Sequence, residues 1–189
     1  EGKKDERVAN DVVTLVDDGQ LLDGLMTFKT DTEGVPSQTT TLIERGFLKS
    51  YLYDSYSAFQ EERSSTGNAE REWPEPFLYV PSVSTSNLVL KPGTKSLYNL
   101  VEEVDEGILI TDFVMGVGHS NRITGEFSVV APNAFFVKNG EIKYPLESVT
   151  VAGNFFNSLK KMREIGSDPK TTSVGKIPSL IIEDLTVSG

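Results

Sequence analysis

The most regular alternation of apolar and polar residues lies between Gly107 and Gly153. Apolar runs at residues 108–110 and 113–115, bounded by glycines, predict a buried strand. Asn139-Gly140 separates two alternating runs and predicts a hairpin, because a type I′ turn needs positive φ at both central residues. The alternation predicts an antiparallel sheet with one face toward solvent. The apolar positions of the two runs are Phe127, Val129 and Ala131 before the turn, and Ile142, Tyr144 and Leu146 after it.

Shorter apolar runs predict the remaining strands. These runs lie at residues 12–16, 40–43, 47–53, 77–80, 87–90 and 178–187. We expect Asp17-Asp18-Gly19 to end the first of these strands, and Arg45-Gly46 to form the turn of a hairpin. Residues 21–37, 64–76 and 171–176 carry glycine or proline among polar residues and are expected to be loops.

Helical spacing occurs in two segments. The first has Thr94 as its expected N-cap and Gly107 at its end, and the second begins at Gly153-Asn154 and ends at Gly166. Residues 55–62 predict a third, short helix. The fold class is therefore α+β, a β-rich domain with a large antiparallel sheet and two or three flanking helices. The apolar positions are Leu97, Leu100, Val101 and Val104 in the first helix, and Phe155, Leu159 and Met162 in the second.

Composition limits the class of protein. With 189 residues, of which 38% are hydrophobic and 24% charged, we expect one globular domain over residues 1–189. No apolar run approaches the roughly 20 residues of a membrane span, and no signal segment follows the charged start. The net charge of −10 repels phosphate backbones, so we expect no direct binding to nucleic acid. Because the chain begins with Glu1 rather than Met, we expect a piece of a longer protein.

Few residues of the chain are able to bind a catalytic metal. There is one histidine, His119, and no cysteine, which excludes disulfides and fits a cytosolic protein. The helical zinc-protease motif needs two histidines on one helix face, so these residues do not form it. Asp17-Asp18 and residues 102–106 lack the spacing of a calcium loop and are interpreted as solvated acidic faces. We predict no metal site in this chain.

The glycine-rich residues 116–125 match two catalytic motifs only in part. Gly118-His119-Ser120 begins like a nucleophile elbow, but Arg122 stands where glycine is needed, and no second histidine activates the serine. Gly116-Val117-Gly118 begins like a dinucleotide fingerprint, but Asn121 stands at the third glycine. His119 is interpreted as a hydrogen-bonding residue of the loop.

Aromatic residues and strand edges are candidate binding surfaces. Phe135 and Phe136 are expected on opposite faces of a strand, and Phe155 is expected in the core. The favoured interpretation of strands 77–80 and 87–90 is pairing within the chain's own sheet; the alternative is an edge that pairs with an extended peptide. Tyr51, Tyr53 and Tyr56 are interpreted as packing residues with solvated hydroxyls.

Five segments, in family order, resemble the C-terminal part of the TldD/PmbA proteins, also called the "modulator of DNA gyrase" family. They are VDDGQLLDGLMTFKTDTEGVPSQTTTLIERGFLKSYLYD near the start, SSTGNA at residues 64–69, TGEFS at 124–128, NGEIKYPLESVTVAGN at 139–154 and PSLIIEDLTVSG at 178–189. No single segment is specific, but the ordered set covers most of the chain.

The resemblance implies a cytoplasmic, two-domain protein that works as a dimer on small unfolded peptides, which it degrades or trims. In the TldD paralogue, which is similar to zinc metalloproteases, the metal is held by an HExxxH helix of the N-terminal domain and a cysteine near the end of the C-terminal domain. The PmbA or TldE paralogue lacks that set. Substrate is held as an added strand inside a closed chamber.

The resemblance favours the PmbA/TldE side, because residues 171–176 carry no cysteine and SSTGNA looks PmbA-like. It implies a non-catalytic subunit whose partner is a TldD-like subunit or a second copy, with zinc only in a TldD-like partner. Two alternatives stay open: the C-terminal half of an active zinc metallopeptidase, and a plain peptide- or protein-binding module. The residues predicted to line the peptide path are Gly116, Gly118, His119, Ser120, Asn121 and Thr124.

Overall fold

The computed structural model describes residues 2–72, 74–75 and 77–189. The chain divides into two compact units. Unit 1 comprises Glu1–Arg7, Val13–Lys91 and Pro169–Pro178. Unit 2 comprises Val8–Val12, Pro92–Asp168 and Ser179–Gly189. A single domain over residues 1–189 stays a prediction.

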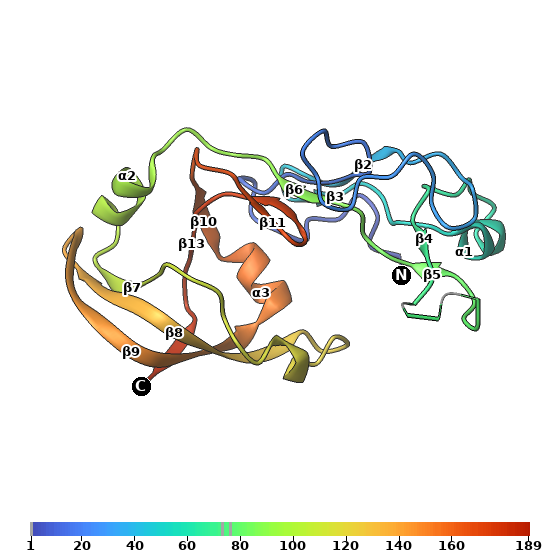
Figure 1. Cartoon of the computed structure of the whole chain (residues 1–189). Helices are drawn as coiled ribbons and strands as arrows, with labels where there is room; N and C mark the ends of the chain where they lie inside the picture. Colours follow the sequence, from blue (N-terminus) through green and yellow to red (C-terminus); the bar gives the residue numbers. More distant parts are fainter. Residues whose placement is uncertain (1, 73, 76) are drawn as a thin grey trace. The chain divides into compact units, whose positions relative to one another are not determined.

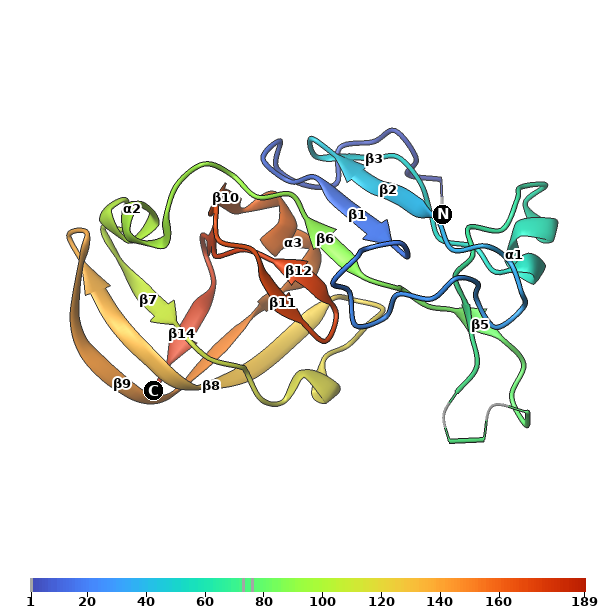
Figure 2. The same ribbon diagram turned by 45° about the horizontal axis from the view of Figure 1, so that its top comes forward.

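A six-stranded mixed sheet forms the centre of unit 1 (Figure 2). Its order is β11 (Lys170–Thr172), β12 (Gly175–Ile177), β6 (Leu88–Leu90), β1 (Leu15–Asp18), β2 (Thr39–Glu44) and β3 (Phe47–Leu48). The β12–β6 pair is parallel and the other pairs are antiparallel. Unit 1 also contains α1 (Ser55–Gln60) and a small ribbon of β4 (Ala69–Glu70) and β5 (Ser82–Val83).

Unit 2 is built on the predicted hairpin, which the structure confirms. β8 (Glu126–Lys138) and β9 (Glu141–Asn154) form a long curved ribbon (Figure 1), and Asn139 and Gly140 between them have φ of 51° and 74°. β7 (Glu106–Ile110) and β14 (Thr186–Ser188) complete an antiparallel sheet of order β14-β9-β8-β7. Its core cluster consists of Ala131, Ala134 and Val149, against which Ile108, Ile110, Val114 and Leu146 pack.

The remaining elements of unit 2 are short. β10 (Met162–Ile165) pairs with β13 (Leu180–Ile182). The helices are α2 (Leu97–Glu102), α3 (Phe155–Lys160) and a 3-10 turn, η1 (Val117–His119). With α1 of unit 1, the described part of the chain holds three short α-helices beside its sheets. The predicted α+β, β-rich fold class is confirmed.

Both longer helix predictions were too long. α2 is capped by Ser96, whose hydroxyl accepts from the Asn99 amide, rather than by Thr94. α3 ends at Lys160, because Met162 and Ile165 are buried in the β10–β13 pair instead of continuing a helical stripe. Phe155, expected in the core, is 55% exposed.

One strand prediction and one loop prediction also need correction, and one strand prediction is confirmed. Residues 77–80 form a turn rather than a strand. β6 is paired with β12 and β1 on its two sides, so it has no free edge for a peptide, and the favoured interior interpretation is confirmed. Residues 171–176, expected as a loop, contain most of the β11–β12 hairpin. Gly175 allows this, because a Cβ there would lie 1.9 Å from the Leu88 carbonyl oxygen.

Candidate functional site

The predicted peptide-path residues lie in one loop of unit 2, between β7 and β8. Before this loop, Met115 and Val130 exchange two backbone hydrogen bonds of 2.8 and 2.9 Å, which tie the incoming chain to β8. Gly116 then adopts φ of 88°, a conformation that favours glycine, and η1 follows. The residue before the loop is therefore hydrogen-bonded to β8.

Asn121 closes the far side of the loop. Its side-chain oxygen accepts hydrogen bonds from the backbone amides of Ile123 and Thr124, at 2.9 and 3.1 Å. Asn154, the N-cap of α3, donates from its side chain to the Thr124 carbonyl at 2.7 Å. The Phe155 amide donates to the Gly125 carbonyl at 2.7 Å. The loop is thereby held against the start of α3.

The loop assembles no catalytic pair among the described residues. The side chains of His119 and Ser120 have no hydrogen-bond partner there, and Asn121 is engaged in closing the loop. A serine becomes a nucleophile when a base takes its proton, and within the described ranges no base is hydrogen-bonded to the Ser120 hydroxyl. The six predicted residues share one loop between β7 and β8.

Exposed apolar side chains flank this loop, and most of them were not anticipated. Gly125 has φ of 81° and adjoins the ring of Phe156, which packs edge-to-face with Phe155 at 5.9 Å. A contiguous exposed apolar patch, unlike single exposed side chains, is a candidate surface for a partner or ligand. The exposed residues are Phe113, Met115, Val117, Ile123, Phe155 and Phe156, from 46% to 90% exposed.

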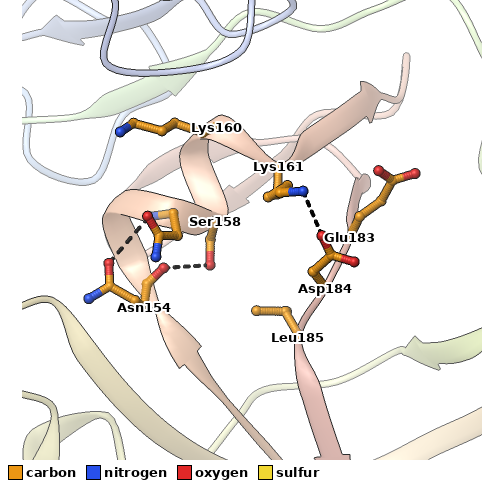
Figure 3. A pocket seen from close by; sticks show the side chains of 8 residues that line it. Asn154, Ser158, Lys160, Lys161, Glu183, Asp184 and Leu185 are labelled. Atoms are coloured by element: carbon orange, nitrogen blue, oxygen red, sulfur yellow. Dashed lines mark hydrogen bonds and ion pairs between the residues drawn. The ribbon is translucent and has the colours of Figure 1, made fainter.

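A second candidate is a hollow of about 400 Å³ between α3 and the end of β13 (Figure 3). Lys161 points toward Asp184 and its Nζ lies 2.6 Å from Asp184 Oδ2. This hydrogen bond, with the charge of Asp184, raises the pKa of Lys161 above its usual value. Glu183 accepts from Arg163 at 3.0 Å. Both carboxylates are therefore paired. The lining residues are Asn154, Asn157, Ser158, Lys160, Lys161, Glu183, Asp184 and Leu185.

Unit 1 contains a buried polar network that sequence reasoning missed. Asp17, interpreted as part of a solvated acidic face at the end of a strand, lies inside β1 and is 1% exposed. Its carboxylate accepts from the Ser86 amide and hydroxyl, both at 2.8 Å, and from Asn68 Nδ2 at 2.7 Å. The apolar pattern gave no signal for this, because the donors come from segments about 50 and 70 residues away.

Other acidic side chains of unit 1 accept backbone amides in the same way. Asp31 accepts from the amides of Glu33 and Val35 with one oxygen and of Ala69 with the other. Asp54 caps α1 by accepting from the amide and hydroxyl of Ser57. These carboxylates order loops and helix ends through hydrogen bonds.

This chain does not contain the side chains that usually bind a catalytic zinc ion. Such sites use three protein ligands, mostly histidine, cysteine and carboxylate. The chain has one histidine and no cysteine. No group of three or more His, Cys, Asp or Glu side chains able to hold a metal ion occurs among the described residues.

The fold defines a β-rich domain in which no metal-holding group of His, Cys, Asp and Glu side chains occurs among the described residues. The chain belongs to the family of the PmbA/TldA metallopeptidase C-terminal domain, whose model matches residues 1–189. This is the family that the five ordered segments indicated, and the prediction is confirmed.

Relatives and solved structures support the family. An uncharacterised protein of Methanocaldococcus jannaschii is 38% identical over 85% of this chain and 36% of its own length. A "Metalloprotease TldD homolog" of Buchnera aphidicola is 30% identical over 98% of this chain and 40% of its own length. The chain thus spans about two-fifths of these relatives or less.

Two crystal structures share the fold. A Thermotoga maritima protein described as a candidate modulator of DNA gyrase is 36% identical with a TM-score of 0.89, covering 99% of this chain and 41% of that one. TldE from Thermococcus kodakarensis is 30% identical with a TM-score of 0.87, covering 100% of this chain and 42% of that one.

No helix in the described ranges has the length and apolar character needed to cross a bilayer.

Proposed function

We propose that this chain is a non-catalytic, PmbA/TldE-like part of a cytoplasmic peptidase dimer, in which it helps to enclose small unfolded peptides for degradation or trimming. The proposal rests on a mismatch between the family of the chain and the few metal-binding side chains that the chain contains. The family is one of metallopeptidases, yet the chain offers a single histidine and no cysteine. Its role is then to form a wall of the chamber while another part supplies the metal.

The loop of residues 116–125 is the proposed contact with the peptide. Around Gly118, a Cβ would meet nothing within 4 Å, so a peptide backbone has room to approach. Exposed Val117 and Ile123 offer apolar contacts, and His119 and Ser120 offer polar groups that are not engaged elsewhere in the described structure. Such a mixture suits an unfolded peptide, which presents both its backbone and apolar side chains.

The partner that we propose is a TldD-like subunit that carries zinc, with a second copy of this chain as the other possibility. The experiment is to measure zinc content and cleavage of unfolded peptides for the purified chain alone, then with the TldD-like protein of the same cell. We expect no stoichiometric zinc and no cleavage alone, and cleavage with the partner. Zinc-dependent cleavage by the chain alone contradicts the proposal.

A second candidate is the C-terminal part of an active zinc metallopeptidase. It is favoured by the 30% identity to a "Metalloprotease TldD homolog" over 98% of the chain. The zinc content of the longer gene product, and an HExxxH helix upstream of Glu1, distinguish this candidate from the first.

A plain binding module is the third candidate, favoured by exposed apolar side chains such as Ile123, which is 90% exposed. Affinity purification from the source cell separates it from the first. Recovery of a TldD-like protein supports the peptidase pair, and its absence supports the binding module.

A further inference from the structure

Unit 1 contains a small hollow of about 220 Å³ that shares no residue with the two candidate sites of unit 2. Three segments line it: the start of the chain, the stretch after β3 and the end of α1. Its volume is smaller than that of pockets for drug-sized ligands, so it suits a ligand with one small functional group. The lining side chains are those of Lys4, Ser50, Tyr51, Tyr53, Glu61 and Arg63.

Backbone hydrogen bonds hold the two cationic lining residues in place. The Asp5 amide donates to the Leu48 carbonyl at 2.7 Å, so the turn that contains Lys4 is held against β3. The Arg63 amide donates to the Ala58 carbonyl at 2.8 Å, in the pattern that ends many helices. The fold therefore brings two positive charges that are distant in the sequence to one hollow.

The lining carries an excess of positive charge. Lys4 and Arg63 form no ion pair among the residues that the structure describes. The acidic lining residue, Glu61, accepts from the Tyr53 hydroxyl at 2.8 Å. Burial, then the hydrogen bond and the charge of Glu61, raise the pKa of Tyr53, whereas the positive charge of Arg63 lowers it, so the charge of Arg63 acts at this wall of the hollow. Two positive charges and one negative leave a single positive charge, in a chain whose net charge is −10.

The same side chains offer the donors that an oxygen anion needs. The guanidinium group of Arg63 has paired N–H groups that match the two oxygens of a carboxylate. The Tyr51 hydroxyl has no hydrogen-bond partner in the described structure, whereas the Ser50 hydroxyl donates to the Tyr51 carbonyl at 3.0 Å. A single net positive charge balances a carboxylate, whereas a divalent phosphate leaves one negative charge uncompensated near Glu61.

We propose that this hollow binds the carboxylate of a small organic acid, which pairs with Arg63 and Lys4 and accepts a hydrogen bond from Tyr51. Such a carboxylate has two possible sources, a free acid and the C-terminus of a short peptide. The inference does not depend on the proposed peptidase role.

The test is titration of the full chain with benzoate, with N-acetylphenylalanine and with inorganic phosphate, followed by NMR through the amide shifts of the lining residues. The neutral amides benzamide and N-acetylphenylalaninamide are the controls of matched shape. We expect saturable shifts with at least one of the two acids, with a Kd in the millimolar range of so small a ligand, and none with its amide. Tighter binding of benzoate supports a free acid as the source, and tighter binding of N-acetylphenylalanine supports a peptide C-terminus.

Variants assign the binding to the lining side chains. Arg63→Gln is expected to weaken binding of the acid at least about tenfold, the effect of a lost hydrogen bond between charged groups, and Tyr51→Phe severalfold. Lys4→Gln is expected to weaken it about tenfold, and Lys3→Gln by less than about twofold, because Lys3 carries the same charge but does not line the hollow.

Thermal unfolding of each variant confirms that the fold is kept, since Lys4 and Arg63 are exposed and Tyr51 is half-buried. The proposal is overturned by absence of saturable shifts with both acids, by equal shifts with the neutral amides, or by tighter binding of phosphate than of either acid. Equal weakening by Lys3→Gln and Lys4→Gln also overturns it, because the effect is then one of overall charge.

Discussion

Asn87 and Asn121 each order a loop, one from the interior of unit 1 and the other from the surface of unit 2. Asn87 is 1% exposed, and its amide joins the Met26 amide, the Asp18 carbonyl and the Thr27 hydroxyl. Asn121 is exposed, and its side-chain oxygen accepts from the amides two and three residues ahead. Asn87 acts through contacts distant in sequence, whereas the side chain of Asn121 closes a local turn within a loop that Asn154 and Phe155 also hold.

This difference shows what each loop is free to do. In unit 1 the side-chain amide of Asn87 is used in hydrogen bonds between segments distant in sequence. In unit 2 the side chains of His119 and Ser120 have no hydrogen-bond partner in the described structure. A loop ordered by local hydrogen bonds can vary its outward side chains without loss of the fold.

Replacing the two asparagines by alanine is expected to give the largest difference. Asn87→Ala leaves buried donors and acceptors unsatisfied and is predicted to lower the free energy of unfolding by about 3 kcal/mol. Asn121→Ala is predicted to cost about 1 kcal/mol or less, because water replaces its partners. Chemical denaturation of both variants is the measurement. Equal losses contradict the distinction between a buried and a surface-ordered loop.

Replacing one glycine of each unit by alanine tests the same comparison through a steric change alone. A Cβ at Gly24 in unit 1 would lie 2.5 Å from Asn87 Oδ1, whereas one at Gly118 in unit 2 would meet nothing within 4 Å. We predict that Gly24→Ala lowers the free energy of unfolding by about 2 kcal/mol, and that Gly118→Ala changes it by less than about 0.5 kcal/mol. Thermal unfolding measures both. A strongly destabilised Gly118→Ala variant argues that this loop is packed rather than open.

The hydroxyl of Tyr53 in unit 1 gives a smaller, pH-dependent effect. Burial, and then its 2.8 Å hydrogen bond to Glu61, raise the pKa of Tyr53 above its ordinary 10.0. The folded state therefore holds the proton more tightly, so this contribution to stability is complete below pH 10 and is lost as pH rises through the folded pKa. Tyr53→Phe is predicted to cost about 1 kcal/mol at neutral pH and to reduce the alkaline loss.

Denaturation of wild type and Tyr53→Phe at neutral and alkaline pH measures both effects. Tyr98→Phe is the control, because Tyr98 is 71% exposed. An identical alkaline loss in wild type and Tyr53→Phe contradicts the assignment of that loss to Tyr53.

The smallest effect is expected at the exposed ion pair of unit 2. Lys161→Gln removes the bond to Asp184, and we predict only a slight change in Tm, because solvent and salt screen exposed pairs. The raised pKa of Lys161 means that the contribution is present below the usual lysine pKa and is lost as pH rises through the folded value. Tm measured at low and high salt tests this. A large change that persists at high salt contradicts it.

Most of the sheet of unit 2 was predictable, whereas the network of unit 1 was not. Asn139-Gly140 and the alternating runs beside it specify the hairpin locally, and β8 and β9 follow them. Gly175 looked like a loop glycine, and only its approach to Leu88 shows why a strand lies there. The predicted peptide-path residues do share one loop. The exposed apolar residues around it, which include Phe155, were missed, because the helical spacing of apolar residues does not indicate which of them the rest of the fold covers.

The sequence by itself determined the family, the β-rich class, the central hairpin and the shortage of metal ligands, because these depend on residue types and on spacing within one segment. Only the tertiary structure decided the role of the acidic residues. Whether Asp17 is a solvated charge or a buried acceptor depends on donors such as Asn68 and Ser86, which are far away in the chain. Burial is a property of the assembled fold, and no local pattern encodes which polar groups will meet inside it.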